Sequence, residues 1–92
     1  MIKSFANRDT QTLFELGQVR RWASIERRAL RKLVQLDLAQ NINDMRVPPG
    51  NRLEALSGNR KGQWSIRIND QFRICFRWSA DGLTDVEIVD YH

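Results

Sequence analysis

The spacing of apolar residues separates a helical first half of the chain from a second half made of strands. From Ser24 onward, apolar side chains recur every three or four residues, which predicts an amphipathic helix with Ser24 as its N-cap. A shorter helix is expected over residues 10–16, between an N-cap at Asp9 and a stop at Gly17. The sequence Val-Pro-Pro-Gly at 47–50 then ends helical structure, because proline lacks the backbone donor that a helix needs.

Beyond this breaker the period becomes an alternation of apolar and polar residues, which is typical of strands. Residues 64–68 and 72–78 alternate on either side of an Asn-Asp-Gln turn, so they predict a hairpin. Further strands are expected at 1–5, 53–56 and 83–91. The apolar faces of these elements predict an α+β fold, with N-terminal helices packed on a curved, mainly antiparallel sheet.

The aromatic residues of the hairpin are assigned to the core in this scheme. They resemble an array for stacking RNA bases, but they share the parity of the neighbouring isoleucines, which favours burial. These residues are Trp64, Phe72, Phe76 and Trp78. Cys75 lies on the other parity without an evident activating group, and we assign it no chemistry.

The size of the chain and its few metal-ligating residues restrict the classes of protein. With 92 residues we expect a single domain, 1–92. One cysteine and one histidine are too few for a tetrahedral zinc site, and a lone cysteine forms no internal disulfide. The glycines form no phosphate loop or dinucleotide turn, so we expect neither a metal nor a cofactor. Without a membrane-spanning run or a secretory leader, the expected location is cytoplasmic, with no membrane partner.

The charge of the chain indicates a polyanionic partner. Fifteen basic residues against eleven acidic ones give a net charge of +4, and the isoelectric point is near 10.0. Three of the fifteen are lysines, so twelve are arginines. The planar guanidinium group of arginine binds phosphate through two parallel hydrogen bonds, and this bias favours RNA.

The polar face of the predicted hairpin is expected to be cationic, because arginines alternate there with the core residues. With the loop at 57–62, five basic residues are expected on one surface: Arg60, Lys61, Arg67, Arg73 and Arg77. Such a cluster attracts a phosphate backbone. The alternative is a solvated face on which the arginines pair with nearby carboxylates: Asp70, Asp85 and Glu87.

The last three residues, Asp90-Tyr91-His92, include a titratable imidazole. Histidine is the side chain most often used for proton transfer near neutral pH, although a terminal histidine is more often frayed and solvated. Tyr91 shares the parity of Glu87 and Val89, which leaves three roles open for its ring: a buried anchor, a stacking platform for a base or a proton donor.

Three motifs stand out together: Leu-Ser-Gly-Asn-Arg at 56–60, Trp-Ser-Ile-Arg-Ile-Asn at 64–69 and Asp-Tyr-His at 90–92. With the stretch 51–76 that contains the first two, they resemble the HigB, or plasmid-maintenance killer, branch of the RelE toxin superfamily. The resemblance covers essentially the whole chain. The motifs are much more specific jointly than any one of them alone.

This resemblance implies a microbial-ribonuclease-like fold and the toxin of a type II toxin–antitoxin pair. Such a toxin is an endoribonuclease that cuts mRNA in the ribosomal A site and thereby inhibits translation and growth. The family cuts without a metal, by attack of the ribose 2′-hydroxyl on the adjacent phosphate. The implied partners are the ribosome, mRNA and a HigA-type antitoxin with a helix-turn-helix domain, which forms a hetero-oligomer with the toxin.

The resemblance also implies roles for single residues. Arg73 matches the phosphate-binding arginine of the family. His92 would transfer a proton, Tyr91 would stack on a base or relay a proton, and Asp90 would orient the terminal segment. Further contacts with RNA are expected from Arg60, Lys61, Arg67 and Arg77.

Two positions depart from the family pattern. Ser57 stands where some members have a lysine, and Glu54 stands where some have a histidine. Either Arg60 and Lys61 compensate for the missing groups, or cleavage is slower. The second hypothesis is therefore a catalytically weakened relative that binds RNA, the ribosome or the antitoxin without efficient cleavage. A DNA-binding repressor is disfavoured, because the strand-rich half has no helix-turn-helix pattern.

Overall fold

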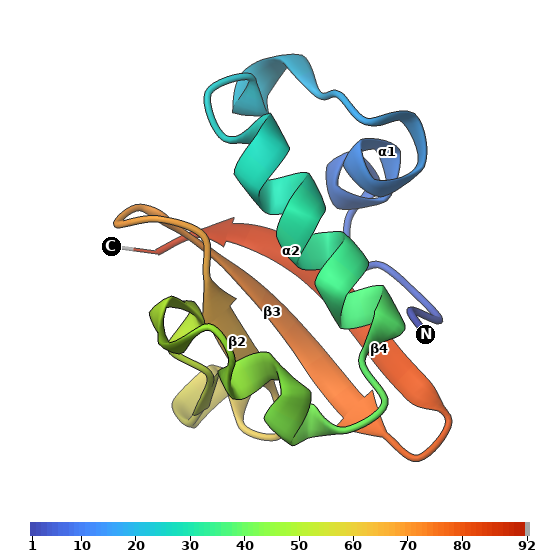
Figure 1. The fold of residues 1–92 in the computed structure, drawn as a ribbon, viewed down its shortest axis with the longest axis vertical. Helices are drawn as coiled ribbons and strands as arrows, with labels where there is room; N and C mark the ends of the chain where they lie inside the picture. The colour runs from blue at the N-terminus through green and yellow to red at the C-terminus, as the bar shows by residue number, and fades with distance from the viewer. Residues whose placement is uncertain (92) are drawn as a thin grey trace.

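The computed structural model describes residues 1–91. Two α-helices, α1 (Arg8–Leu16) and α2 (Glu26–Leu38), pack on an antiparallel sheet with the strand order β1-β2-β3-β4 (Figure 1). The strands are β1 (Glu54–Ala55), β2 (Trp64–Arg67), β3 (Phe72–Ser79) and β4 (Gly82–Asp90). The predicted α+β class, with N-terminal helices on an antiparallel sheet, is confirmed.

The first helix ends as predicted but begins differently. The side chain of Asn7 is the N-cap, and its Oδ1 accepts the N–H of Thr10 at 2.9 Å. Asp9, the predicted N-cap, lies in the first turn instead, where its charge complements the helix dipole. Gly17 ends the helix in the left-handed region, at a φ of 84°, as a C-terminal glycine commonly does.

The second helix has no side-chain cap, so the prediction that Ser24 is its N-cap is wrong. Ile25 occupies the N-cap position, and no side-chain hydrogen bond caps the helix there. The side chain of Ile25 is buried, and its carbonyl accepts the N–H of Ala29 at 2.8 Å. Packing of an apolar residue therefore determines where this helix begins, in place of a polar cap.

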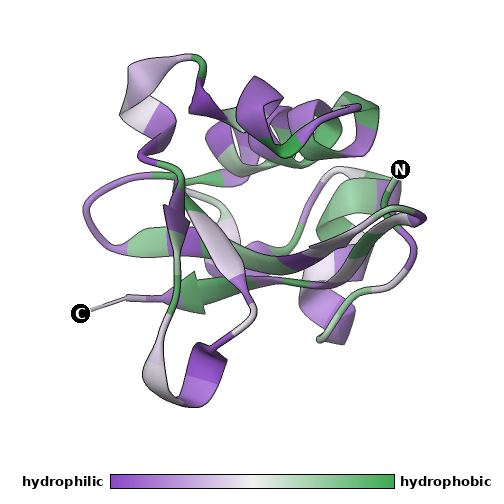
Figure 2. Ribbon diagram, turned by 90° about the horizontal axis from the view of Figure 1, so that it is seen from below, coloured by the Kyte–Doolittle hydropathy of each residue, from purple (hydrophilic) through white to green (hydrophobic). Residues whose placement is uncertain are grey.

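The core lies between the helices and one face of the sheet. The apolar stripe of α2 and the inward-facing strand residues form it: Ala29, Leu33, Leu36, Ile66, Ile74, Phe76, Val86 and Ile88. Trp64, Phe72 and Trp78 are partly buried and pack against this cluster, which confirms that the hairpin aromatics belong to the core. In Figure 2, apolar positions in green and polar positions in purple alternate along the strands.

Both edges of the sheet differ from simple alternation. The register of β3 and β4 shifts between Cys75 and Arg77, and Asp85 opposite this shift has a φ of 54°. Leu83 and Val86 are consequently both buried, although simple alternation would place an odd-numbered and an even-numbered residue on opposite faces. The strand predicted at 53–56 is reduced to β1.

The predicted N-terminal strand is present only as isolated bridges beside β4. Ile2 pairs with Leu83 and Phe5 with Val86, both in parallel orientation. The N–H of Ile2 also donates to Asp37 Oδ1 at 2.9 Å, which joins this segment to the end of α2. Within residues 1–91, none of the helices has the length and apolar character needed to cross a membrane.

Candidate functional site

Three oxygen acceptors hold the guanidinium group of Arg73 on the outer face of the sheet. Nε donates to Ser65 Oγ at 2.8 Å, and Nη2 donates to the carbonyl oxygen of Arg52 at 2.8 Å. Nη2 also lies 3.3 Å from Oε1 of Glu54. The side chain of Arg73 is only 12% exposed, so the planar guanidinium group is fixed in one orientation before any ligand binds.

The strand register and the loop before β1 bring these acceptors together. Arg67 faces Arg73 across the β2–β3 ladder, and Ser65 is therefore a diagonal neighbour of Arg73 on the same face. Arg52 follows the short 3₁₀ helix η3 (Pro49–Asn51) and has left-handed backbone angles, with a φ of 47° and a ψ of 53°. The carbonyl oxygen of Arg52 is thus within hydrogen-bond distance of Arg73.

Asn51 stabilises this loop from inside the protein. Its side chain is fully buried, and Nδ2 donates to the carbonyl oxygens of Met45 at 3.1 Å and Val47 at 3.2 Å. Lys32 of α2 donates to its Oδ1. Because Lys32 belongs to α2 whereas Met45 and Val47 lie on the segment before the two prolines, Asn51 links both to the loop that positions Arg52.

The ring of Tyr91 lies beside Arg73 and separates two pockets. The Cζ atom of Arg73 is 5.6 Å from the ring centroid, which is within the range of a cation–π contact. A pocket of about 290 Å³ is lined by Glu54, Ala55, Leu56, Ser57, Asn59, Arg60 and Tyr91. A second pocket, of about 200 Å³, is lined by Arg52, Arg67, Asn69, Asp70, Arg73 and Tyr91. We call these the Glu54 pocket and the Arg73 pocket.

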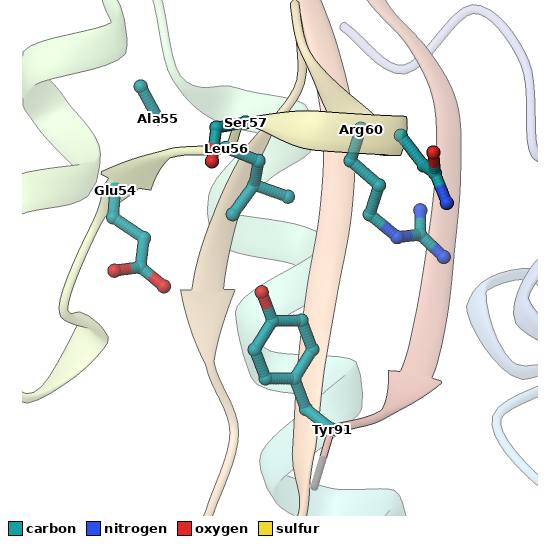
Figure 3. A pocket seen from close by; sticks show the side chains of 7 residues that line it. Glu54, Ala55, Leu56, Ser57, Arg60 and Tyr91 are labelled. Carbon is teal, nitrogen blue, oxygen red and sulfur yellow. The ribbon is translucent and has the colours of Figure 1, made fainter.

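The Glu54 pocket contains groups of both charges and a phenol. Figure 3 shows the hydroxyl of Tyr91 pointing into the region between Glu54 on one side and Arg60 on the other. The Tyr91 side chain is 41% exposed, and that of Glu54 is 52% exposed. The backbone N–H of Tyr91 donates to the carbonyl oxygen of Gln71 at 2.6 Å, which anchors the tyrosine to the β2–β3 turn.

Arg60, from the short 3₁₀ helix η4 (Gly58–Arg60), is held by a carboxylate of β4. Its Nη1 lies 2.9 Å from Oε1 of Glu87 and 3.0 Å from Oε1 of Gln63. The hydrogen bond with Glu87 raises the pKa of Arg60 and outweighs the opposing effect of burial. Arg60 therefore contributes a fixed positive charge to the wall of the Glu54 pocket.

Ion pairs cover the outer face of the sheet, as in the alternative in which the arginines pair with nearby carboxylates. These pairs are Arg60–Glu87, Arg67–Asp70 and Arg77–Asp85. The pair of Arg73 with Glu54 was not anticipated from the sequence. Lys61, which follows η4, is exposed. The arginines of this face are consequently less available to an anion than a count of cations suggests.

The structure brings some of the predicted site residues together and separates others. Arg60, Arg67, Arg73 and Tyr91 line one or both of the two pockets. Arg77 lines neither pocket. Asp90 lines a different pocket, of about 270 Å³, beside Arg21 and Trp22, and its Oδ2 accepts from Gln71 Nε2 at 3.0 Å. His92, to which we assigned proton transfer, lies outside the described residues.

Cys75 is fully buried, although it shares the outer parity with Arg73. Burial raises the pKa of the Cys75 thiol, since it disfavours the thiolate. The thiol is therefore protonated near neutral pH. Within residues 1–91, histidine, cysteine and acidic side chains form no group of three that could hold a metal ion.

Comparisons with known proteins agree on one family. A family model described as the RelE-like toxin of type II toxin–antitoxin system HigB matches residues 3–92. The chain is 50% identical over 70 residues to Toxin HigB-1 of Vibrio cholerae serotype O1, which covers 76% of this chain and 73% of that protein. It is also 30% identical over 93 residues to Endoribonuclease HigB of Proteus vulgaris, which covers 100% of both chains.

A solved structure supports the fold independently. The YoeB/ParE toxin from Agrobacterium tumefaciens has a TM-score of 0.56 to this chain, and the match covers 98% of this chain and 99% of that one. The sequence identity of the two chains is 22%, so this likeness concerns the arrangement of helices and strands alone.

Proposed function

The chain belongs to the RelE-like HigB toxins of type II toxin–antitoxin systems, and from this premise we propose that it is an endoribonuclease that cuts mRNA on the ribosome. Membership in such a system implies an antitoxin partner. We further propose that this antitoxin is of the HigA type, with a helix-turn-helix domain, and that the two form a hetero-oligomer.

The proposed reaction uses the RNA itself as the nucleophile. The ribose 2′-hydroxyl attacks the adjacent phosphorus, and the bond from phosphorus to the 5′-oxygen of the next nucleotide breaks. The products end in a 2′,3′-cyclic phosphate and a 5′-hydroxyl, so no water or metal-bound hydroxide enters the step. The protein has to accept the proton of the 2′-hydroxyl, neutralise charge on the phosphate and deliver a proton to the leaving oxygen.

Arg73 is assigned to the phosphate. Ser65 and the Arg52 carbonyl hold its guanidinium group from one side, and this arrangement supports binding of a phosphate oxygen where Glu54 now lies. A donor that is oriented in advance costs no reorganisation during the reaction, and its removal typically costs about 3 kcal/mol of transition-state stabilisation. This fixed guanidinium group, between two pockets that share Tyr91, is the observation that carries the proposal.

Glu54 is assigned to the proton of the 2′-hydroxyl. Its half-exposed carboxylate lines the pocket next to Arg73, and a carboxylate accepts a proton as the histidine of some family members would. Tyr91 is assigned to stacking on a base, since its ring is 41% exposed between the two pockets. His92 as donor to the leaving oxygen and Asp90 as its orienting group rest on the family resemblance.

The ribosome is assigned to positioning the mRNA. Both pockets are small, with volumes of about 290 and 200 Å³, so the chain alone fixes only a short piece of RNA. Arg60, Lys61, Arg67 and Arg77 are proposed to add backbone contacts. Arg60 and Arg67 line the pockets, whereas Lys61 and Arg77 would act on RNA beyond them.

The test maps the ends of translated mRNA after brief induction without antitoxin. The wild-type chain should arrest growth and produce discrete ends with 5′-hydroxyl groups, and mRNA with a 2′-deoxyribose at the cut position should resist cleavage by purified toxin and ribosomes. Arg73→Ala and Glu54→Gln should each lower the cleavage rate by roughly a hundredfold or more. Arg8→Ala, on the first turn of α1, is the matched control and should cut at the wild-type rate.

The same experiment decides between this proposal and the weakened relative that Glu54 and Ser57 motivate. A binding protein without activity would stall ribosomes but leave no cut ends. Ends with 5′-phosphate groups would indicate hydrolysis by water and would contradict the assignment of the 2′-hydroxyl as nucleophile.

A further inference from the structure

The arginines of α2 differ from those of the sheet in having no carboxylate partner. Arg27, Arg28 and Arg31 are exposed, and no carboxylate of the described residues lies within 4.0 Å of their nitrogen atoms. Glu26, the acidic residue of the first turn, accepts the N–H of Val19 at 3.2 Å instead. This part of α2 therefore carries positive charge that the protein itself does not neutralise.

The surface of these arginines adjoins the Arg73 pocket. A pocket of about 360 Å³ is lined by Ala23, Ser24, Ile25, Arg27, Arg28, Arg31 and Asn69. Asn69 also lines the Arg73 pocket, together with Tyr91. The side chain of Asn69 lies in the β2–β3 turn, where its Oδ1 accepts the N–H of Phe72 at 2.8 Å and that of Gln71 at 2.9 Å. One fixed turn thus forms a wall of both pockets.

Positive charges of α2 and of the sheet both act on Lys32 of α2. Burial lowers the pKa of Lys32, and the positive charges of Arg31, Arg28 and Arg67 lower it further. Arg67 lines the Arg73 pocket, whereas the other three residues lie on α2. An anion bound close to these residues would reduce the repulsion among them.

We propose that the outward face of α2, around Arg27, Arg28 and Arg31, binds the backbone phosphates of the single-stranded RNA where that strand leaves the Arg73 pocket. The inference rests on the proposed function, because the cleaved phosphate at Arg73 sets the starting point of the strand. A continuous RNA strand fits better than an acidic peptide, since the shared wall at Asn69 joins the α2 surface to a site for a phosphate. Arg27 and Arg31 are one helical turn apart and lie on the same side of α2.

The test measures binding of purified toxin to 2′-O-methyl RNA, which lacks the nucleophilic hydroxyl and is not cut. One oligonucleotide has about three nucleotides and fills only the pockets, and another has about ten and reaches beyond them. The variant Arg27→Gln/Arg31→Gln should weaken binding of the longer oligonucleotide roughly tenfold or more and leave that of the shorter one unchanged. The slope of log Kd against log salt concentration should fall by about 1.4 for the longer oligonucleotide, because about 0.7 is lost for each phosphate contact.

The matched control, Lys3→Gln/Arg8→Gln, removes the same net charge from the N-terminal segment and α1. It should bind both oligonucleotides nearly as the wild type does. An equal loss in both double variants would mean that net charge alone acts, and a loss on the shorter oligonucleotide would place Arg27 and Arg31 in the cleavage pocket. Either result overturns the inference, as does unchanged binding of the longer oligonucleotide or equally tight binding of polyglutamate. Failure of the proposed function is recognised separately, by the absence of cut ends in translated mRNA.

Discussion

Removal of the Ser65 hydroxyl should release Arg73 from its fixed orientation. Ser65 is fully buried, and its Oγ accepts Arg73 Nε at 2.8 Å. In Ser65→Ala, the guanidinium group keeps the Arg52 carbonyl and Glu54 but loses the acceptor nearest its side-chain stem. A hydrogen bond to a charged group contributes roughly 1.5–3 kcal/mol, and water replaces it only in part at a side chain that is 12% exposed. We expect the free energy of unfolding to fall by about 1–2 kcal/mol.

The cleavage rate should fall more than a structural role alone would explain. We expect the lost hydrogen bond to act only in the transition state, where its contribution is about 1.4–2.7 kcal/mol. Its loss then corresponds to a decrease in kcat of roughly tenfold to a hundredfold. KM should change little, because the remaining contacts still bind the phosphate. Serine does not titrate in the working range, so the shape of the pH profile should be that of the wild type. Single-turnover cleavage of mRNA on purified ribosomes measures the rate, and urea denaturation measures stability.

Ser79→Ala provides the matched control. Ser79 ends β3 far from Tyr91, and its Oγ donates to the carbonyl oxygen of Gly82 at 3.0 Å. Loss of this exposed hydrogen bond should lower stability slightly and leave cleavage unchanged. If Ser65→Ala lost stability but cut at the wild-type rate, Ser65 would serve the fold alone and the orientation of Arg73 would not limit the reaction.

Two further predictions concern the fold. Gly82→Ala should lower the free energy of unfolding, measured by chemical denaturation, by about 2 kcal/mol or more. A Cβ atom at this position, where φ is 137°, would lie 2.5 Å from the carbonyl oxygen of Met1. The control Gly50→Ala, where a Cβ atom meets no other atom within 4 Å, should change the free energy of unfolding by less than about 1 kcal/mol. Burial raises the pKa of the Cys75 thiol, so the thiol of the unfolded chain loses its proton at a lower pH than that of the folded chain. The contribution of Cys75 to the free energy of unfolding should therefore be constant below about pH 8.5 and fall above it, by at most about 1.4 kcal/mol per pH unit. Cys75→Ala should remove that part of the slope, and identical slopes in the two proteins would show that the thiol does not contribute.

The periodicity of the chain was sufficient to predict the sheet and the packing of the helices. Alternation in β2 and β3 and the turn between them fixed the hairpin, because a shift of one residue would expose the whole apolar face. The helix caps were less accessible: polar residues near a helix start are common, and the buried side chain of Ile25 determines the start of α2. The register shift near Asp85 was missed as well, although the spacing of three residues between Leu83 and Val86 is the signal of an extra residue in β4.

The site was predictable where it depends on parity and not where it depends on a loop. Parity placed Arg73 on the polar face of the hairpin but left the role of Tyr91 open, and the structure brings the two side chains together. The hairpin register contains the signal that identifies Ser65 as a diagonal neighbour of Arg73. The carbonyl of Arg52 is different, because its direction follows from a left-handed backbone that a non-glycine residue rarely adopts. The pairing of Glu54 with Arg73 follows in turn from that loop, so the sequence showed Glu54 only as a departure from the family.

Glu54 gives the free protein a feature that a histidine at this position would not supply. Its carboxylate occupies a donor of Arg73, so a phosphate that binds there has to displace it. The displaced carboxylate would remain in the adjacent Glu54 pocket, beside Tyr91, where we assign it to the proton of the 2′-hydroxyl. Glu54 and the substrate would then compete for the same guanidinium group, so Glu54→Gln should strengthen binding of free RNA even as it slows the proposed cleavage.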